Sequence, residues 1–520
     1  MKVRVSGLVW LPVDNLSPQQ ILNIKNQLTV YPKKTTDIGD QSDPPPIFMF
    51  EENEADGLIG VPRGYYLSTT SGNHDEELDV SFGRPMREFG TTYKADGHFT
   101  EQESVMRVFA NQMEGRKWGG FLLKAGCGFG KTAVALEFAR RTGRKTLILV
   151  HQEFFLDQWR DRISEFMPDA RVGIIRQKKC EYEDCDFVIG MLQSLAKDDG
   201  TRYPSDMYKA FGMIINDECH RVGAATWAAI IPRFYAAWRL GLTATPRRKD
   251  GAQDVFFNHI SEISYSAETE AQIPKLRKLV THTRLKPIAR GKYRVATANL
   301  NSAQILTQLG ADSFRAKDVV DQLVLAVKAE RKIMVVSERI SHLKMMSDML
   351  TNALFDMHLP FTPKVDFYTG EWFTGERWDN TTKTHRKGDP KMGKRSRDDL
   401  KKAESANVIF ATKQMVSEGL DIQALDVLVL STPLGDIEQP VGRVRRWCTA
   451  SDKKCQRLCP WRAGKCEEKP TPIVMDVVDE DIPQLMPKWK RRQRFYDKLG
   501  VTGRKAEKHE RSQRQKRLSI

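Results

Sequence analysis

A glycine-rich segment that ends in Lys-Thr stands between an apolar run and a helix-like run near residue 130. Its sequence, AGCGFGKT, spans residues 125–132. Small residues allow consecutive backbone N–H groups to turn inward and cradle phosphate at the positive end of the following helix. Lys131 can then reach the β- and γ-phosphates, and the Thr132 hydroxyl is the expected ligand for Mg²⁺. The glycines that permit this turn are Gly126, Gly128 and Gly130. A glycine-rich turn before a core helix is the plainer interpretation.

Two carboxylates follow a second apolar run. Asp217 and Glu218, in the segment DECH, come directly after residues 211–216. In α/β sheets ligands bind at the carboxyl ends of the strands, where Asp217 can hold Mg²⁺ and Glu218 can orient or deprotonate water. An acidic pair after a strand is more often a solvated loop. Here the pair lies about 85 residues after the phosphate loop, which suits several intervening βα units.

These groups need a scaffold, and the chain offers two series of apolar strand-length segments alternating with helix-like stretches. The first series falls within residues 98–272 and the second within 273–486. Such alternation predicts an α/β fold with parallel, doubly wound sheets. The predicted strands are FLLKA, KTLILV, VGII, FVIG, GMIIN and WRLGLT, then KIMVVS, KVDFY, NVIFA, DVLVLS and PIVMDVV.

The two ends of the chain differ from this pattern. Residues 1–97 contain short β-like stretches (VRVSGLVWLPV, PIFMF, RGYYL) and a helix-like PQQILNIKNQL, which predict a small α+β accessory domain. That domain either helps to hold nucleic acid or only packs against the rest. Residues 487–520 form a basic tail, either an electrostatic tether or a solubilising end. The net charge of +15 and a pI near 9.3 favour a polyanionic partner.

Six sequence blocks occur in a fixed order: AGCGFGKT, HQEFFLDQW, DECH, GLTATP, ATKQMVSEGLD and QPVGRVRR. In this order they resemble the motifs of superfamily 2 helicases, and most closely the branch that includes XPB and the phage UvsW-type helicases. The resemblance covers roughly residues 99–479. In that family the first motif begins with alanine, so Ala125 conforms. The resemblance implies two tandem RecA-like domains, with ATP in the cleft between them and cleft closure as the step along a strand.

The resemblance also assigns roles by position. It makes Gln102 the reader of adenine, although Phe99-Thr100-Glu101 replaces the usual Arg-Pro-Tyr before it. Residues 243–245 would link the nucleotide state to domain closure. The implied nucleotide contacts in the phosphate loop are Ala125, Gly126, Cys127, Gly128, Phe129, Gly130, Lys131 and Thr132. The implied contacts from the second domain are Gly419 and Asp421 to ribose and nucleic-acid backbone, Gln439 to the γ-phosphate, and Arg443 and Arg446 as arginine fingers.

Two insertions in the second domain stand outside these motifs. Residues 371–398 are basic with two tryptophans, which suits a nucleic-acid-contacting loop or a flexible solvated one. Residues 448–466 hold four cysteines, Cys448, Cys455, Cys459 and Cys466, spaced C-x6-C-x3-C-x6-C. Four thiolates can close a structural zinc site, and an iron–sulfur cluster or unligated thiols are the alternatives. Any such metal would not take part in ATP hydrolysis.

The sequence therefore predicts an ATP- and Mg²⁺-dependent helicase or translocase. The expected partner is single-stranded, forked or branched DNA, in recombination, repair or replication restart, in a phage-encoded cytoplasmic protein that is a monomer or weak oligomer. An RNA helicase or transcript-release factor stays open, because motor motifs contact mainly the sugar–phosphate backbone. A restriction-system motor stays open too, whereas the intact motifs argue against a scaffold with a degenerate ATPase. We expect no membrane span, since no run reaches about 18 apolar residues.

Overall fold

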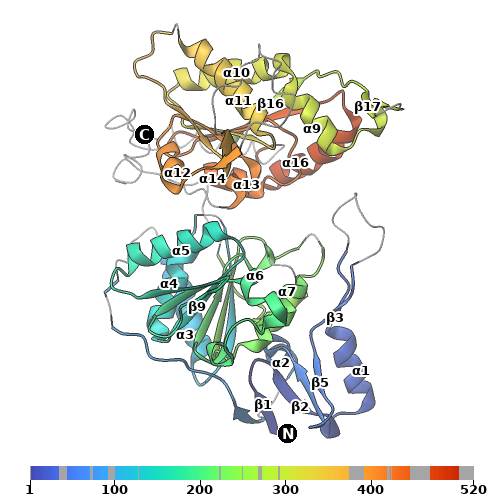
Figure 1. The fold of residues 1–520 in the computed structure, drawn as a ribbon, viewed down its shortest axis with the longest axis vertical. Helices are drawn as coiled ribbons and strands as arrows, with labels where there is room; N and C mark the ends of the chain where they lie inside the picture. Colours follow the sequence, from blue (N-terminus) through green and yellow to red (C-terminus); the bar gives the residue numbers. More distant parts are fainter. Residues whose placement is uncertain are drawn as a thin grey trace, which may run out of the picture. The chain divides into compact units, whose positions relative to one another are not determined.

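A computed structural model gives the fold (Figure 1), and the chain divides into two compact units, residues 1–269 and 270–520. The structure describes all residues except 1, 34–43, 71–73, 89, 92–99, 127, 222–223, 249, 268–271, 291–292, 356, 374–391, 419–421, 423, 446–458, 460–468 and 503–520.

Unit 1 is built on an eight-stranded sheet that is parallel except for one pair at its edge, β10 and β11. Its central strands are apolar and buried along their whole length, as expected where helices cover both faces. In spatial order the strands are β11 (Lys179–Cys180), β10 (Val172–Arg176), β12 (Phe187–Met191), β9 (Thr146–Val150), β13 (Met213–Asn216), β14 (Trp238–Thr243), β8 (Gly119–Ala125) and β15 (Ile263–Ala267).

The helices of this sheet follow the strands along the chain. They are α3 (Thr100–Met113), α4 (Lys131–Thr142), α5 (Glu153–Phe166), α6 (Leu192–Leu195), α7 (Ala224–Ile230) and α8 (Asp254–His259). The carboxyl ends of β8, β13 and β14 lead into the phosphate loop, the DECH box and the GLTATP block. All six strands predicted for this region are present, so the parallel α/β fold is confirmed here.

The N-terminal part of unit 1 is a second, smaller sheet with antiparallel pairs and one parallel pair, β1 with β7. Its strands in spatial order are β5 (Glu51–Asn53), β6 (Leu58–Val61), β2 (Val9–Pro12), β1 (Lys2–Val5) and β7 (Asp75–Leu78). It also contains α1 (Pro18–Gln27), α2 (Arg63–Thr69) and the ribbon of β3 (Thr29–Val30) and β4 (Ile47–Phe48). The β-like prediction for RGYYL was wrong, because these residues begin α2 and bury Tyr66 against the core.

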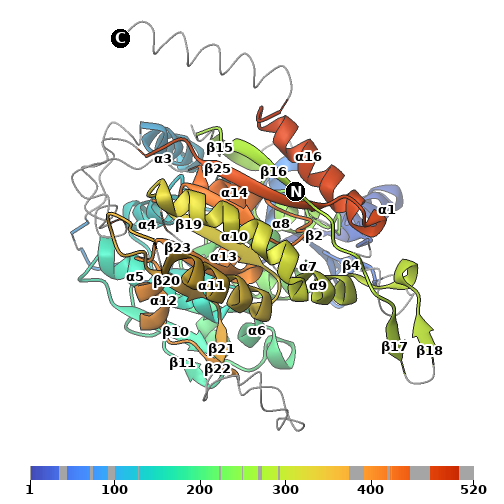
Figure 2. The same cartoon turned by 90° about the horizontal axis from the view of Figure 1, so that it is seen from above.

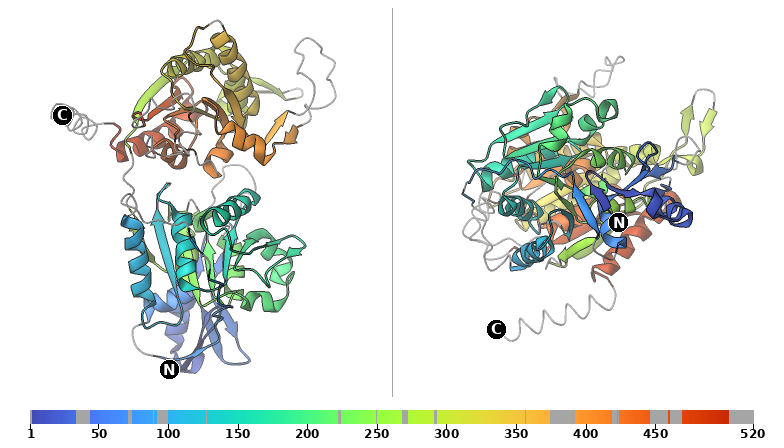
Figure 3. Two further views of the ribbon diagram at one scale, coloured as in Figure 1. Left: turned by 90° about the vertical axis from the view of Figure 1, so that its left-hand side faces the viewer. Right: turned by 90° about the horizontal axis from the view of Figure 1, so that it is seen from below.

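The smaller sheet lies at the amino end of the larger one (Figure 3). Two buried arginines fasten it there. Arg63 donates to the carbonyls of Ser6 and Ala236 at 2.6 and 2.7 Å. Arg239 donates to the carbonyl of Gly7 at 2.8 Å. Gly7 is required at this contact, since a Cβ there would lie 1.5 Å from the carbonyl oxygen of Pro232. The N-terminal sheet is therefore an integral part of unit 1.

Unit 2 is a six-stranded parallel sheet covered by helices. In spatial order its strands are β16 (Lys275–Thr281), β25 (Ile473–Asp479), β24 (Val427–Leu430), β19 (Ile333–Ser337), β23 (Val408–Thr412) and β20 (Val365–Tyr368). The helices are α9 (Ser302–Ala311), α10 (Ser313–Lys328), α11 (Ile340–Phe355), α12 (Arg397–Ala403), α13 (Lys413–Glu418), α14 (Glu438–Val444) and α16 (Met486–Lys498). The five strands predicted for this unit are present, which confirms two tandem RecA-like sheets.

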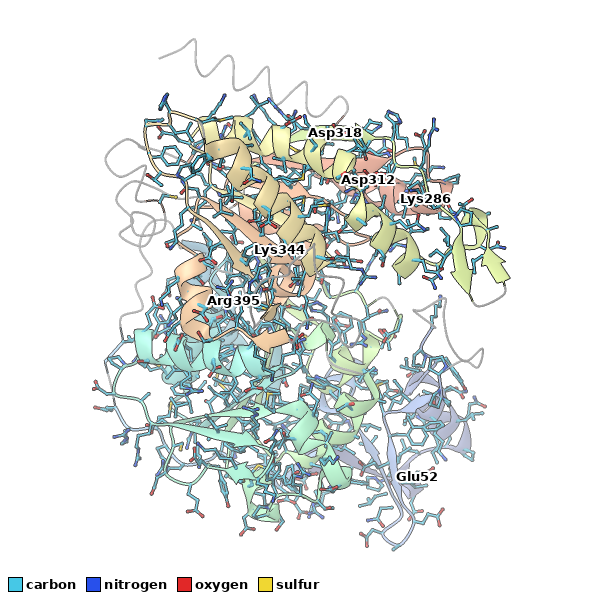
Figure 4. The ribbon with its side chains drawn as sticks, turned by 45° about the horizontal axis from the view of Figure 1, so that its top comes forward. Glu52, Lys286, Asp312, Asp318, Lys344 and Arg395 are labelled. Carbon is cyan, nitrogen blue, oxygen red and sulfur yellow. The ribbon has the colours of Figure 1, made fainter. Side chains whose placement is uncertain are left out.

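Two ribbons extend unit 2: β17 (Ile288–Arg290) with β18 (Tyr293–Val295), and β21 (Glu371–Phe373) with β22 (Met392–Lys394). The second ribbon is the stem of the basic insertion. Trp372 packs on Phe367 with ring centroids 3.9 Å apart, and Arg395, labelled in Figure 4, pairs with Asp366 at 3.3 Å. These contacts hold both ends of the insertion against β20. Residues 374–391 lie outside the described part.

None of the helices in the described part of the chain is both long and apolar enough to cross a bilayer.

Candidate functional site

The phosphate loop joins the end of β8 to the start of α4. Gly128 and Gly130 have φ angles of 91° and 87°, a left-handed conformation that a side chain would strain. The amide Nε2 of buried Gln102 donates to the carbonyl oxygen of Phe129 at 2.6 Å. A Cβ on Gly130 would lie 2.5 Å from that same Nε2 atom. The loop is thus held open by glycine geometry and braced by α3.

Lys131 connects the loop to the DECH box. Its Nζ donates to the Ala125 carbonyl at 3.0 Å and lies 3.8 Å from Oε1 of Glu218. The two side chains are only 11% and 15% exposed, so their charges are weakly screened by water. Thr132 follows at the second position of α4. The lysine and a carboxylate therefore meet at the carboxyl ends of β8 and β13, with Thr132 next to the lysine in the chain.

Asp217 is the first residue after β13, and a tryptophan fixes its carboxylate. The indole Nε1 of Trp159, on α5, donates to Oδ2 of Asp217 at 2.8 Å. Burial and the neighbouring Glu218 carboxylate raise the pKa of Asp217 to about 6. A divalent cation would relieve the repulsion between these two carboxylates, and carboxylate and hydroxyl oxygens are the ligands that Mg²⁺ prefers. The residues present fit Mg²⁺ with a nucleotide phosphate.

Glu218 sits in a strained backbone conformation and has a neighbour that orients it. Its φ is 46°, which is unfavourable for a residue with a side chain. Nδ1 of His220 lies 3.3 Å from Oε2 of Glu218 and 2.9 Å from the hydroxyl of Thr243. That hydroxyl also accepts from the backbone N–H of Thr245 at 3.2 Å. The DECH box and the GLTATP block are thus joined through His220.

Arg248 extends this network to the N-terminal part of the chain. Its guanidinium donates to the His220 carbonyl at 2.7 Å and to both carboxylate oxygens of Asp250 at 2.9 and 2.6 Å. The backbone N–H of Lys33, just after β3, donates to the Asp250 carbonyl at 2.8 Å. A continuous chain of contacts therefore links the DECH box to the ribbon of β3 and β4, called the accessory ribbon below.

The structure brings together most of the predicted residues of unit 1. They are Gln102, Ala125, Gly126, Gly128, Phe129, Gly130, Lys131, Thr132, Asp217 and Glu218. In unit 2, Gln439 and Arg443 lie four residues apart on α14 and are half-buried. Cys127, Gly419, Asp421 and Arg446 fall outside the described residues, and their predicted roles stay predictions.

The predicted zinc site gains no support. Cys448, Cys455 and Cys466 lie outside the described residues. Cys459 is buried in an apolar core of unit 2, among side chains such as Val444 and Val474. In the described part of the chain no three His, Cys, Asp or Glu side chains gather as a metal site would require.

Sequence reasoning gave no role to Trp159, His220 or Arg248. Trp159 closes the block HQEFFLDQW, which the sequence identified only by its place in the order of motifs. His220 and Arg248 stand inside or beside recognised blocks, so proximity to a motif was the available signal. Their partners lie between 2 and 58 residues away in sequence, and only the sheet topology brings the more distant of them together.

Several known proteins are similar to this chain. Residues 98–248 match the family described as "Type III restriction enzyme, res subunit". A protein of Acanthamoeba polyphaga mimivirus, provisionally named ATP-dependent RNA helicase L396, is 27% identical over 504 residues, covering 96% of this chain and 86% of that protein. Helicase 109L of Invertebrate iridescent virus 3, also provisionally named, is 28% identical over 218 residues, covering 41% and 65%. The crystal structure of T4 UvsW covers 95% of this chain and 97% of that chain, with 15% identity and a TM-score of 0.37.

The family match covers the phosphate loop, the DECH box and the GLTATP block, and the mimivirus relative spans both RecA-like units. The six ordered motifs, with Lys131 beside Glu218 at the carboxyl ends of β8 and β13, complete the assignment. The protein is a helicase and a nucleic-acid-dependent ATPase, and its six ordered motifs resemble those of superfamily 2 helicases of the UvsW/XPB-like type.

Proposed function

We propose that this helicase is an ATP-driven DNA motor that acts on forked or branched DNA. The observation that carries the catalytic part is the cluster of Lys131, Asp217 and Glu218. In this proposal Lys131 binds the β- and γ-phosphates, and Thr132 and Asp217 hold Mg²⁺. Mg²⁺ bound there would neutralise charge that develops on the transferred phosphoryl group. Glu218, oriented by His220, accepts a proton from the attacking water.

The proposed contribution of unit 2 is charge stabilisation and strand contact. Arg443 would spread its planar charge over the phosphoryl oxygens, with Gln439 beside it on α14 and Arg446 following. Gly419 and Asp421 would contact ribose and the nucleic-acid backbone. Gln102 would read adenine with the amide oxygen, since its Nε2 already donates to Phe129.

The choice of DNA is supported by the motif resemblance to the UvsW-type branch and by the accessory sheet fastened to unit 1. RNA is the second candidate, because the mimivirus relative that spans most of the chain carries the name of an RNA helicase. Motor motifs read mainly sugar and phosphate, so the motif residues themselves favour neither polymer.

Steady-state ATP hydrolysis at one fixed salt concentration tests the proposal, with no nucleic acid, single-stranded DNA, duplex DNA, forked DNA and RNA as the five arms. Stimulation of kcat chiefly by single-stranded or forked DNA is expected. Stimulation chiefly by RNA would move the protein to transcript handling. Strand separation on the fork, measured with a fluorophore and quencher, distinguishes unwinding from translocation alone.

Glu218→Gln is the matched negative control, because it keeps the size and polarity of the side chain but cannot take up a proton. We expect this variant to bind ATP and to hydrolyse it at least about a hundredfold more slowly. Turnover near the wild-type rate would remove Glu218 from the mechanism.

A further inference from the structure

Helix α16 presents a basic outer face that the ATP site does not use. Figure 2 shows α16 at the edge of unit 2, beside β25. The helix has one acidic residue, Asp497, whose carboxylate accepts from the Thr502 hydroxyl. Its exposed cations are Lys490, Arg491, Arg494 and Lys498. Three of them, at positions 490, 494 and 498, follow one another at i, i+4 spacing and therefore form a stripe along the helix.

The cations of this stripe have no ion-pair partners among the described residues, unlike two lysines on other surface helices of the same unit. On α10, Lys317 pairs with Asp321 at 2.9 Å, and on α11, Lys344 pairs with Asp348 at 2.7 Å. Like charges at i, i+4 repel and destabilise a helix, whereas opposite charges there stabilise it. The cations of the α16 stripe therefore repel one another, and a bound polyanion would reduce this repulsion.

Buried contacts fix the opposite face of α16. Arg492 donates to Oδ2 of Asp476 on β25 at 2.8 Å and to the Leu434 carbonyl at 2.8 Å. The hydroxyl of Tyr496 donates to the same Asp476 oxygen at 2.8 Å. Because the inner face is held at two successive turns, the backbone that carries the outer cations is already ordered and loses little entropy on binding.

The positive surface continues from α16 to the carboxyl end of β23. Half-buried Lys488 lies near Lys413, the first residue of α13, and near Arg491. Burial lowers the pKa of Lys488, and Lys413, Arg492 and Arg491 lower it further, against the opposing effect of Glu338. Glu338 is already paired with Lys413 at 3.2 Å. One carboxylate thus faces several cations at this edge of the sheet.

From these contacts we infer that α16, with Lys413 and Lys488, is a binding surface for the sugar–phosphate backbone of the DNA strand. The surface rests on the proposed function only in taking DNA as the polyanion. Apart from Lys413 its cations lie outside the six motifs, and contacts to phosphate read no bases, so the surface adds affinity without sequence preference. Through this surface unit 2 would bind the strand whether or not a nucleotide is bound.

The test is equilibrium binding of the full-length protein to fluorescent single-stranded and forked DNA, from about 50 to 200 mM salt. The variant combines Lys490→Gln, Arg494→Gln and Lys498→Gln. The charge-matched control combines Lys317→Gln, Lys328→Gln and Lys344→Gln on α10 and α11; Lys344 is labelled in Figure 4. All six side chains except half-buried Lys344 are exposed, so both variants should fold.

We expect the α16 variant to bind roughly ten- to hundredfold more weakly near 100 mM salt. The slope of log K against the logarithm of the salt concentration should become less steep by about 2 to 3. The control should stay within about twofold of wild type. Equal losses in both variants would mean that net charge alone matters, and unchanged binding in the α16 variant would mean a solvated face; either result overturns the inference.

Wild-type ATPase measurements separate this outcome from failure of the proposed function. If DNA does not stimulate the wild-type enzyme but RNA does, the choice of polymer fails. A parallel loss of RNA binding in the α16 variant would then still support the surface. If DNA stimulates the wild type and the α16 variant binds normally, only the surface is wrong.

Discussion

The indole of Trp159 holds the carboxylate expected to bind Mg²⁺, although 58 residues separate the two side chains in sequence. Trp159→Phe keeps the buried aromatic ring and removes the N–H donor. A hydrogen bond to a charged group contributes about 1.5 kcal/mol or more, so we expect the Mg²⁺ concentration for half-maximal ATPase to rise about tenfold. The measurement is ATP hydrolysis against Mg²⁺ at saturating ATP and DNA.

Trp227 provides a matched control for this substitution. It is as buried as Trp159, each being 1% exposed, but its indole nitrogen has no hydrogen-bond acceptor among the described residues. Trp227→Phe should therefore leave the Mg²⁺ requirement unchanged. A similar rise in both variants would show that the effect of Trp159→Phe comes from packing and not from the bond to Asp217.

The sequence predicted single residues well where each chemistry lay within one short block. Lys131 and Glu218 could be named because a phosphate loop and an acidic pair are contiguous patterns. Trp159 and Arg248 could not be given roles, because their partners are defined by the order of the strands in the sheet. The distance of 3.8 Å between Lys131 and Glu218 likewise depends on β14 lying between β8 and β13.

At the scale of elements, the guanidinium of Arg248 joins the DECH box to Asp250, whose carbonyl accepts from the accessory ribbon. Arg248→Ala should lower kcat about tenfold with little change in the KM for ATP, because it loosens the backbone that positions Glu218 without touching the phosphate loop. Arg248→Lys should not restore kcat, since one ammonium cannot serve the His220 carbonyl and both Asp250 oxygens together.

Neighbouring residues supply the controls for this element. Arg247 is exposed, so Arg247→Ala should behave as wild type. Lys33→Pro removes the backbone N–H that donates to Asp250, whereas Lys33→Ala retains it. A reduced kcat in the proline variant alone would indicate that the accessory ribbon supports the ATP site. Equal activity of the two Lys33 variants would confine the effect to Arg248 and its own loop.

The central strands were predictable because they are continuous apolar runs buried on both faces, such as TLILV in β9. The edge strands β15 and β16 were missed, since their exposed side chains, including Lys275, Arg277 and Lys278, interrupt any apolar run. RGYYL was mistaken for a strand because aromatic residues favour strands, whereas tertiary packing of Tyr66 selects a helix.

At the scale of the whole molecule, the described part of each unit buries a histidine that must stay neutral. Burial lowers the pKa of His259 in unit 1 and of His342 in unit 2 to about 3, and Arg239 and Arg315 act in the same direction. An unfolded histidine has a pKa of about 6.5. Between these values the unfolded chain binds a proton that the folded unit does not, so stability present above about pH 6.5 is lost as the pH falls.

We therefore expect each histidine to cost its own unit about 1.4 kcal/mol of unfolding free energy between about pH 7.5 and 5.5. Urea unfolding at the two pH values, followed by tryptophan fluorescence, measures this loss. His259→Gln should reduce the loss for unit 1 alone, and His342→Gln for unit 2 alone, whatever each substitution does to stability at neutral pH. The exposed His282 gives the control, because His282→Gln replaces a histidine without touching a buried one. A full wild-type loss in both buried variants would show that the acid sensitivity does not come from these two histidines.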